Sequence, residues 1–450
     1  MPRRFLVLFT LVFTACPMAM ASLAEAIAAR PGEIIEVPAG RHLIDAPLLF
    51  TVDGGGLYGP GTIVQTDPSQ PIVRVDHAAG VRIEGVTLTR PEGARETPES
   101  AIRADHARDL VIRRVRIVDN HSQAGAITLR DCERTTLTDC DIINYKTIGI
   151  DDRTTSPLFG YAFHCIDGTG IFVTRSIHTT IANNRIIEER LLPTEASKDE
   201  HSLGSVTDGA EPLNLGELGS RVVRDGYVDN WHQGSAIVVT GPTQSRHTII
   251  QGNLIVNSAQ GIDLHSDYAN VSGNVIDRCM IGIKAMHGSY GVVVSGNTIT
   301  GADLWGMVFG PGTASHGTEP AEEGGEPREW NGDAGLIIAN NLIADYGNGN
   351  EYWNWGGRRE DGAGGYAIAF LAGQLDTNPP YTDILLTGNM VLTGGRTQDP
   401  LMPPKYRYAL YLEGWDGDTR TNPTAAKDIR VESNTFHPGL RGISNAKFGE

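Results

Sequence analysis

Three consecutive segments of the chain share one pattern: Ile250-Gln-Gly-Asn253-Leu-Ile255, Val271-Ser-Gly-Asn274-Val-Ile276 and Val294-Ser-Gly-Asn297-Thr-Ile299. In each, an apolar residue precedes two small or polar residues, an asparagine, one variable residue and a second apolar residue. The three asparagines are 21 and 23 residues apart. A nearly fixed period of this length is typical of a repeat architecture.

The pattern extends in both directions and makes ten units in all. The other seven begin at Ile83, Ile112, Leu137, Ile181, Ile338, Leu386 and Val431. A second segment, with the pattern apolar-polar-apolar, follows each unit. The first residues of these ten segments are Ile102, Ile127, Ile150, Ile171, Ile237, Ile262, Ile283, Met307, Ile368 and Leu410. This alternation is the signature of a strand with one face buried. Units of twenty-odd residues cannot bury an apolar face alone, so they must stack into a solenoid of strands.

The recurring asparagines indicate bends, because asparagine tolerates left-handed backbone and its amide can bond the next coil. With these features, residues 32–447 resemble the right-handed parallel β-helix proteins of the pectate-lyase-like superfamily. The resemblance implies an all-β, single-stranded solenoid of about ten or more coils. A short amphipathic helix at Leu23–Arg30 is expected to cap its open N-terminal end.

Residues 1–21 predict a secretory signal peptide, with Arg3 and Arg4, an apolar run and a final Ala-Met-Ala. We therefore expect a secreted or periplasmic protein, with lipid anchoring at Cys16 as an alternative. The apolar run is too short to span a bilayer. Residues 22–450 show no second hydrophobic period, which predicts one β-helix domain and a monomer.

The formal charge is −17, and −19 without the signal, so nucleic acid and anionic membranes are poor partners. A polyanionic sugar would need a local basic patch. Outside the signal the cysteines are Cys132, Cys140, Cys165 and Cys279. Cys140 occupies an asparagine position of the repeat, which favours a buried thiol, although a Cys132–Cys140 bridge stays open in an oxidising compartment.

Long insertions interrupt the repeat at residues 188–232, 311–334, 345–365, 393–407 and 414–428. All five flank the second strand of their unit, so they are expected to wall a groove over one sheet; tolerated surface insertions are the alternative. Exposed aromatic rings in such a groove can stack on sugars. The candidate substrate-binding residues are Trp231, His232, Trp305, Trp353, Trp355 and Arg130, with Trp330 and Trp415 also in the insertions.

Alignment of the second strands places Asp151, Asp263 and Lys284 in one outward column, and Arg130, Arg153 and His265 in the next. Neighbouring coils lie ~4.8 Å apart, so Asp263 and Lys284 should stack, with His265 beside them. His287, Tyr268 and His232 should lie at the adjoining corners. We expect these side chains to face solvent.

This cluster fits proton abstraction next to a uronate carboxylate, which needs a cation on the carboxylate and a base near the C5 proton. Lys284 or Arg153 could neutralise the carboxylate, and His265, His287 or Tyr268 could move protons. The alternative for Asp263 and Lys284 is an exposed ion pair worth ~0–1 kcal/mol.

The segment from Gln260 to His265 is also similar to the Tyr-Gly-Phe-Asp-Pro-His strand of the β-helical mannuronan C5-epimerases. Gly261, Asp263 and His265 match the glycine, aspartate and histidine of that strand. Gln260, Leu264 and Met286 replace that family's tyrosine, proline and aspartate, which leaves the proton donor open.

The sequence thus predicts a polysaccharide lyase acting on an acidic polymer such as alginate, with a C5-epimerase or a non-catalytic binding solenoid as alternatives. A glycoside hydrolase using Asp151 and Asp152 is a further alternative. No cofactor is required by the sequence. Ca²⁺ at Asp416 and Asp418 is possible, although a plain acidic turn fits these residues better.

Overall fold

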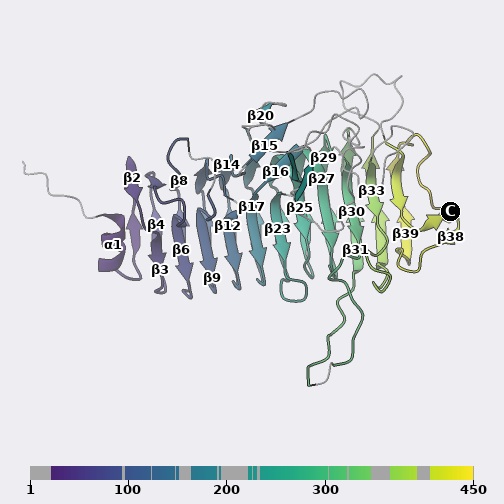
Figure 1. The fold of residues 1–450 in the computed structure, drawn as a ribbon, viewed down its shortest axis with the longest axis horizontal. Helices are drawn as coiled ribbons and strands as arrows, with labels where there is room; N and C mark the ends of the chain where they lie inside the picture. The colour runs from purple at the N-terminus through teal and green to yellow at the C-terminus, as the bar shows by residue number, and fades with distance from the viewer. Residues whose placement is uncertain are drawn as a thin grey trace, which may run out of the picture.

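The computed structural model describes residues 22–93, 97–122, 124–146, 148–151, 164–189, 192–193, 221–224, 227–230, 234–302, 304–321, 324–345, 365–392 and 406–448. Over these ranges the chain winds into an elongated right-handed parallel β-helix (Figure 1). Each coil but the last described one, which holds β39 and β40, contributes three strands, and these stack on their counterparts in the neighbouring coils.

The first stack is a 12-stranded parallel sheet. Its strands are β1 (Ile34–Glu36), β4 (Gly56–Tyr58), β7 (Arg82–Glu84), β10 (Val111–Arg113), β13 (Thr136–Thr138), β18 (Thr180–Ala182), β24 (Ile249–Gln251), β26 (Asn270–Ser272), β28 (Val293–Ser295), β31 (Ala334–Ala339), β34 (Thr382–Thr387) and β39 (Ile429–Glu432).

The second stack follows the asparagine bend of each coil. It holds β2 (Arg41–Ile44), β5 (Thr62–Gln65), β8 (Thr87–Thr89), β11 (Arg116–Val118), β14 (Asp141–Ile143), β19 (Arg185–Ile187), the first parts of β25 (Leu254–Leu264) and β27 (Val275–Met286), β29 (Thr298–Thr300), β32 (Leu342–Ala344), β35 (Met390–Val391) and β40 (Thr435–Phe436).

The third stack closes each coil. It holds β3 (Leu48–Phe50), β6 (Val73–Asp76), β9 (Ile102–Asp105), β12 (Gly125–Arg130), β17 (Thr169–Thr174), β23 (Ser235–Thr240), the second parts of β25 and β27, β30 (Trp305–Gly310), β33 (Tyr366–Phe370) and β36 (Tyr408–Leu412). β25 and β27 run unbroken from the second stack into the third.

The predicted asparagine ladder is confirmed. The Oδ1 atom of Asn274 accepts from the main-chain N and the Nδ2 of Asn253, both at 2.9 Å, and Asn297 repeats this toward Asn274. The ladder runs through Asn184, Asn253, Asn274, Asn297, Asn341, Asn389 and Asn434. The flanking apolar residues point inward, as Ile250 and Ile255 are fully buried.

Cys140 ends the asparagine ladder as a buried thiol, since its main-chain N donates to Asn184 Oδ1 at 3.0 Å. Cys132 is buried as well, and the two are free thiols rather than a disulfide. Burial raises the pKa of Cys132 to about 11 and that of Cys140 to about 12, so both thiols are unreactive at neutral pH.

The assignment of Ile150-Asp151 to the repeat is wrong. β12 pairs directly with β17, so no coil passes between them. Instead β15 (Ile148–Asp151) pairs antiparallel with β16 (His164–Asp167) and parallel with β20 (Leu192–Pro193) in a small separate sheet. Alternation alone identified a strand but not its partner. Asp151 therefore does not belong to the outward column of Asp263, and Arg153, two residues later, lies outside the described residues.

The N-terminal end carries the expected helix, α1 (Leu23–Ala29), which begins with a capping box between Ser22 and Glu25. Leu23 is buried, and the helix contacts β1 and β3 at the end of the solenoid (Figure 1). Residues 1–21 lie outside the described residues. Within the described ranges no helix is long and apolar enough to cross a bilayer.

Two short hairpins complete the description. β21 (Arg221–Arg224) pairs antiparallel with β22 (Tyr227–Asn230), and β37 (Trp415–Asp416) pairs antiparallel with β38 (Thr419–Arg420). A longer excursion after β30 carries antiparallel bridges at His316–Asn331 and Glu319–Arg328. It projects from the edge of the helix where the third-stack strands end (Figure 1).

Candidate functional site

The predicted charged cluster forms on the outer face of the third stack. Asp263 of β25 is the register partner of Lys284 of β27, and their Oδ2 and Nζ atoms are 3.3 Å apart. His265 follows Asp263 by two residues, so it projects from the same face of the sheet. Its Nε2 lies 3.0 Å from Asp263 Oδ1. This is an ion-pair distance, although neither atom meets hydrogen-bond geometry with any partner.

Two further residues hold His265 in place. The Thr240 hydroxyl, one coil earlier, lies 3.1 Å from His265 Nδ1, so the two ring nitrogens face Thr240 and Asp263. The His287 ring, from the turn after β27, meets the His265 ring edge to face with centroids 4.5 Å apart. His287 in turn packs on Gly312, where a Cβ atom would lie only 2.0 Å from His287 Nδ1.

The cluster is buried, which corrects the expectation that these side chains face solvent. The side chains of Lys284, Asp263 and His265 are 3%, 9% and 18% exposed. The pair is therefore not the exposed ion pair considered above, and its interaction is stronger than that of a surface pair. His265 is the most exposed member of the three.

Burial also sets the protonation of the cluster. Burial alone would raise the pKa of Asp263, but the adjacent Lys284 ammonium group, together with the contact to His265, outweighs it and holds that pKa well below its usual range. Burial lowers the pKa of His287 to about 3, helped by repulsion from His265 and Lys284. At neutral pH, Asp263 is therefore an anion and His287 is a neutral ring.

The other predicted residues are spread along the solenoid. Arg130 lies in the predicted column, since the register runs from Arg130 to Thr174 and on to Thr240. Its nearest acidic partner is Asp105, with Nε and Oδ1 3.9 Å apart. Trp305 begins β30 and is 4% exposed, which leaves little of its ring for a sugar. The remaining candidates Arg153, Trp231, His232, Trp353 and Trp355 lie outside the described residues.

Tyr268 lies in the turn between β25 and β26, with 49% of the residue exposed. Its ring stacks on His247 and meets Tyr290 edge to face, with centroids 5.2 and 5.5 Å away. These contacts run along the corner of the solenoid. A part in proton transfer by Tyr268 stays a prediction.

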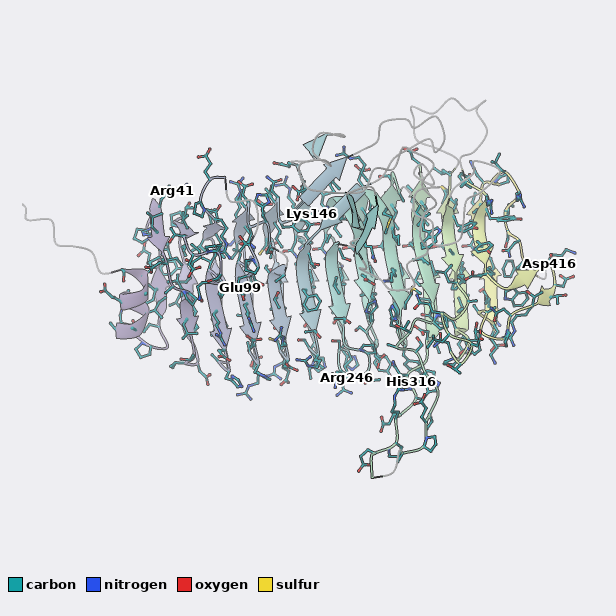
Figure 2. The ribbon with its side chains drawn as sticks, in the orientation of Figure 1. Arg41, Glu99, Lys146, Arg246, His316 and Asp416 are labelled. Atoms are coloured by element: carbon teal, nitrogen blue, oxygen red, sulfur yellow. The ribbon has the colours of Figure 1, made fainter. Side chains whose placement is uncertain are left out.

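Two buried groups outside the cluster were not singled out from the sequence. Asp333 Oδ1 accepts from the main-chain N of Gly288 and Ser289, at 3.0 and 2.9 Å, and so fixes the turn that carries His287. Lys146 is fully buried at the edge of the solenoid opposite Arg246 (Figure 2). Its Nζ donates to the Asn257 carbonyl, and burial lowers its pKa to about 7. Lys146 comes three residues after the end of β14, so the strand pattern carries no signal for it.

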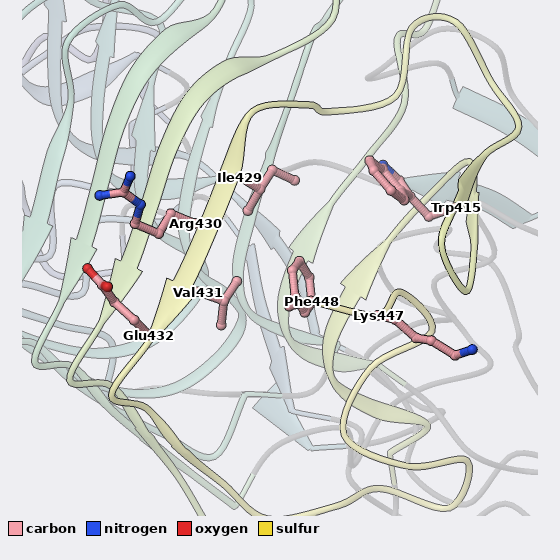
Figure 3. Close-up of a pocket in the computed structure, with 7 residues that line it drawn as sticks. All are labelled: Trp415, Ile429, Arg430, Val431, Glu432, Lys447 and Phe448. Atoms are coloured by element: carbon pink, nitrogen blue, oxygen red, sulfur yellow. The ribbon is translucent and has the colours of Figure 1, made fainter. Parts of the chain in front are cut away.

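Asp416 and Asp418, the weaker calcium candidates of the sequence, lie in the β37–β38 hairpin. Asp418 lies 3.7 Å from Lys447 Nζ and is largely exposed. Across the described residues no group of three or more His, Cys, Asp or Glu side chains is arranged to hold a metal ion. A nearby cavity of about 420 Å³ is lined by residues of β39, by Trp415 and by the stretch that includes Lys447 and Phe448 (Figure 3). It lies at the far end of the solenoid from α1.

Comparison with models of protein families gave no match, and a search of curated protein sequences gave none either. Among solved structures, the chain is similar to alginate lyase AlyF-OU02 in complex with G6, with 11% identity, 94% of this chain and 83% of that chain covered, and a TM-score of 0.50.

Two further solved structures show the same likeness. The A-module of mannuronan C-5 epimerase AlgE4 from Azotobacter vinelandii is 11% identical, with 95% of this chain and 92% of that chain covered and a TM-score of 0.47. An exopolygalacturonase from Thermotoga maritima is 12% identical, with 82% and 81% covered and a TM-score of 0.49. Such low identities show the fold alone. The predicted right-handed parallel β-helix fold is confirmed.

Proposed function

We propose that the protein is a polysaccharide lyase that cleaves a uronate-containing polymer by β-elimination, with His265 as the base. The observation that carries the proposal is the buried row of His265, Asp263 and Lys284 on the outer face of one sheet. Buried charged groups arranged side by side, with few other partners, are more typical of a reaction site than of a stabilising ion pair.

The chemistry assigns one role to each side chain. His265 takes the C5 proton of the sugar, the C4–O4 bond breaks, and its electrons leave with O4 as the C4–C5 double bond forms. Protonated His265 or a water returns a proton to O4. Asp263, an anion beside the ring, orients His265 and stabilises its protonated form. With Nε2 facing Asp263, Nδ1 is the nitrogen that accepts the C5 proton, so the Thr240 hydroxyl, 3.1 Å from Nδ1, must give up this contact when the sugar binds.

Lys284 supplies the positive charge that the sugar carboxylate needs as negative charge builds up next to C5. An ammonium group has three N–H donors, and only one is needed for the contact with Asp263. Since Lys284 is 3% exposed, the substrate carboxylate can reach it only after the groups that cover it move aside.

The test is to incubate the purified protein with polymannuronate, polyguluronate and polygalacturonate while following absorbance near 235 nm. A rise on one of these polymers supports the proposal, because β-elimination leaves an absorbing unsaturated uronate. A panel without any rise would rule out the lyase.

A C5-epimerase is the second candidate, favoured by the Gly261, Asp263 and His265 match. Its first step is the same proton removal, but the proton returns to the opposite face of C5 and no bond is cleaved. Deuterium uptake at C5 from heavy water, without absorbance near 235 nm, would identify this activity.

A further inference from the structure

A row of aromatic rings follows the turns between the third and first stacks. His178, His247 and Tyr268 stand two residues before β18, β24 and β26, and their rings stack with centroids 5.2 Å apart at each step. Tyr290 and Trp330 continue the row at interplanar angles of 88° and 90°, with centroid spacings of 5.5 and 5.8 Å. The faces of the Tyr268, Tyr290 and Trp330 rings therefore point in different directions.

These three rings line a pocket of about 530 Å³ at the end of the row. Tyr268, Tyr290 and Trp330 are 49%, 38% and 42% exposed, so their surfaces are open to a ligand. The other lining residues are Thr243, Asp267, Gly288, Asn331, Gly332, Ala334, Thr382 and Asp383. Among the described residues that line the pocket there are thus two carboxylates and no Lys, Arg or His.

Two glycines provide the space in which the rings lie. A Cβ atom at Gly291 would come within 2.8 Å of the Tyr268 ring, and one at Gly332 within 2.3 Å of the Trp330 indole. Any larger residue at either position would therefore displace a ring. These close approaches and the contacts between the rings restrict the ring positions, which lowers the cost of ordering them on binding.

The pocket is separate from the Asp263 cluster but adjoins it across a turn. Gly288 lines the pocket and directly follows His287, whose carbonyl accepts from Asn331 Nδ2 at 3.4 Å. Figure 2 places Arg246 on this same edge of the solenoid. Arg246 is the bridge partner of Asp267 in the preceding coil and does not line the pocket.

The charge of the pocket favours a cation. Burial raises the pKa of Asp267 to about 6, against the opposing effects of the Tyr290 main-chain N–H and Arg246, so a bound cation would stabilise its ionised form. Aromatic faces attract ammonium groups through their quadrupole, and they also stack on the C–H face of a sugar. A uronate would instead be repelled by Asp267 and Asp383.

We propose that this pocket binds a protonated amino-sugar residue of a glycan, with the sugar ring on the aromatic side chains and its ammonium group near Asp267 and Asp383. The proposal does not depend on the lyase activity, because none of Asp263, His265, Lys284 and His287 lines the pocket.

The test is calorimetric titration of the full chain with a fully deacetylated chitosan hexamer and with the fully N-acetylated hexamer, which has the same backbone without the charge. We expect the deacetylated hexamer to bind at least about tenfold more tightly, and salt to weaken its binding. Trp330→Ala and Asp383→Asn should each weaken it by about fivefold or more, in the range of a cation–π or ion contact.

Gly332→Ala is a second probe, because it shifts the indole without removing a polar group. Its matched control is Gly317→Ala in the same excursion, where a Cβ atom meets nothing within 4 Å. Weakened binding in the first variant alone would support the proposal. Equal affinity for the two hexamers, full affinity in Trp330→Ala, or an absence of binding to either hexamer would each overturn it.

Discussion

The burial of the Asp263–Lys284 pair gives a sharp test of the site geometry. Lys284→Met keeps the side-chain volume and removes the charge. The Asp263 carboxylate then stays buried without the ammonium group that lies 3.3 Å from it in the wild type. Removing one partner of a buried pair costs about 3–5 kcal/mol, because the remaining charge is uncompensated. Asp263→Asn should have a similar effect by leaving the Lys284 ammonium unpaired.

The double variant Asp263→Asn/Lys284→Met should be more stable than the sum of the two single effects implies, with a coupling of about 2 kcal/mol or more. The matched control is Asp109 with Arg134, an exposed pair whose atoms lie at 2.6 and 3.0 Å. Arg134→Met and Asp109→Asn should each cost at most about 1 kcal/mol.

The assay is thermal unfolding by scanning calorimetry at neutral pH for the wild type, the four single variants and the two double variants. Midpoints are compared directly, since long repeat arrays do not always unfold in a single step. The coupling is then read as a midpoint shift in the double variant that is smaller than the sum of the two single shifts. A Lys284→Met midpoint no lower than that of Arg134→Met would contradict the reasoning, because the pair would then be hydrated in solution.

Three further outcomes follow from the contacts. His265→Ala should lower turnover by about 10²-fold or more, as for a lost general base. Arg103→Ala, four strands away in the outward column of Asp263, should not lower it, and equal losses would place the catalytic centre elsewhere. Asn274→Leu removes the acceptor of a buried main-chain N–H and should lower the stability of the folded chain by about 3 kcal/mol. Asn434→Leu, at the less buried end of the ladder, should lower it by only about 1 kcal/mol, and equal midpoint shifts would refute this expectation. Burial raises the pKa of Asp333 to about 7 in the folded state. The stability that the protonated Asp333 side chain contributes is therefore complete below about pH 4 and is lost as the pH rises toward 7. Asp333→Asn should flatten the plot of unfolding midpoint against pH over this range.

The sequence predicted the stacking because stacking depends on the period alone. Residues one period apart occupy the same place in successive coils, so the positions of Asn253 and Asn274 already fixed one ladder step, and those of Asp263 and Lys284 fixed a neighbouring pair. The same reasoning failed at Ile150-Asp151, where an alternating segment belongs to an insertion. A strand pattern does not identify the partner strand, and β17 competes for the same place in the coil.

The pocket at Tyr268, Tyr290 and Trp330 was beyond such reasoning for a related reason. Tyr268 and Tyr290 come from consecutive turns, but Trp330 is brought to them by the excursion that follows β30. The period places the first two rings, whereas the path of the excursion, supported by glycines at 291 and 332, places the third.

The burial of Asp263 and Lys284 distinguishes a reaction site from an exposed ion pair, and this burial was not predictable from the repeat. On an open β-helix face, Asp263 and Lys284 would form a solvated pair that contributes little to stability and nothing to chemistry. The same two residues at 9% and 3% exposure interact through a medium of lower dielectric, where each charge strongly changes the protonation of its neighbours. The period of the sequence therefore selects which side chains meet on this face, whereas their surroundings decide whether that meeting gives a surface ion pair or a reactive site.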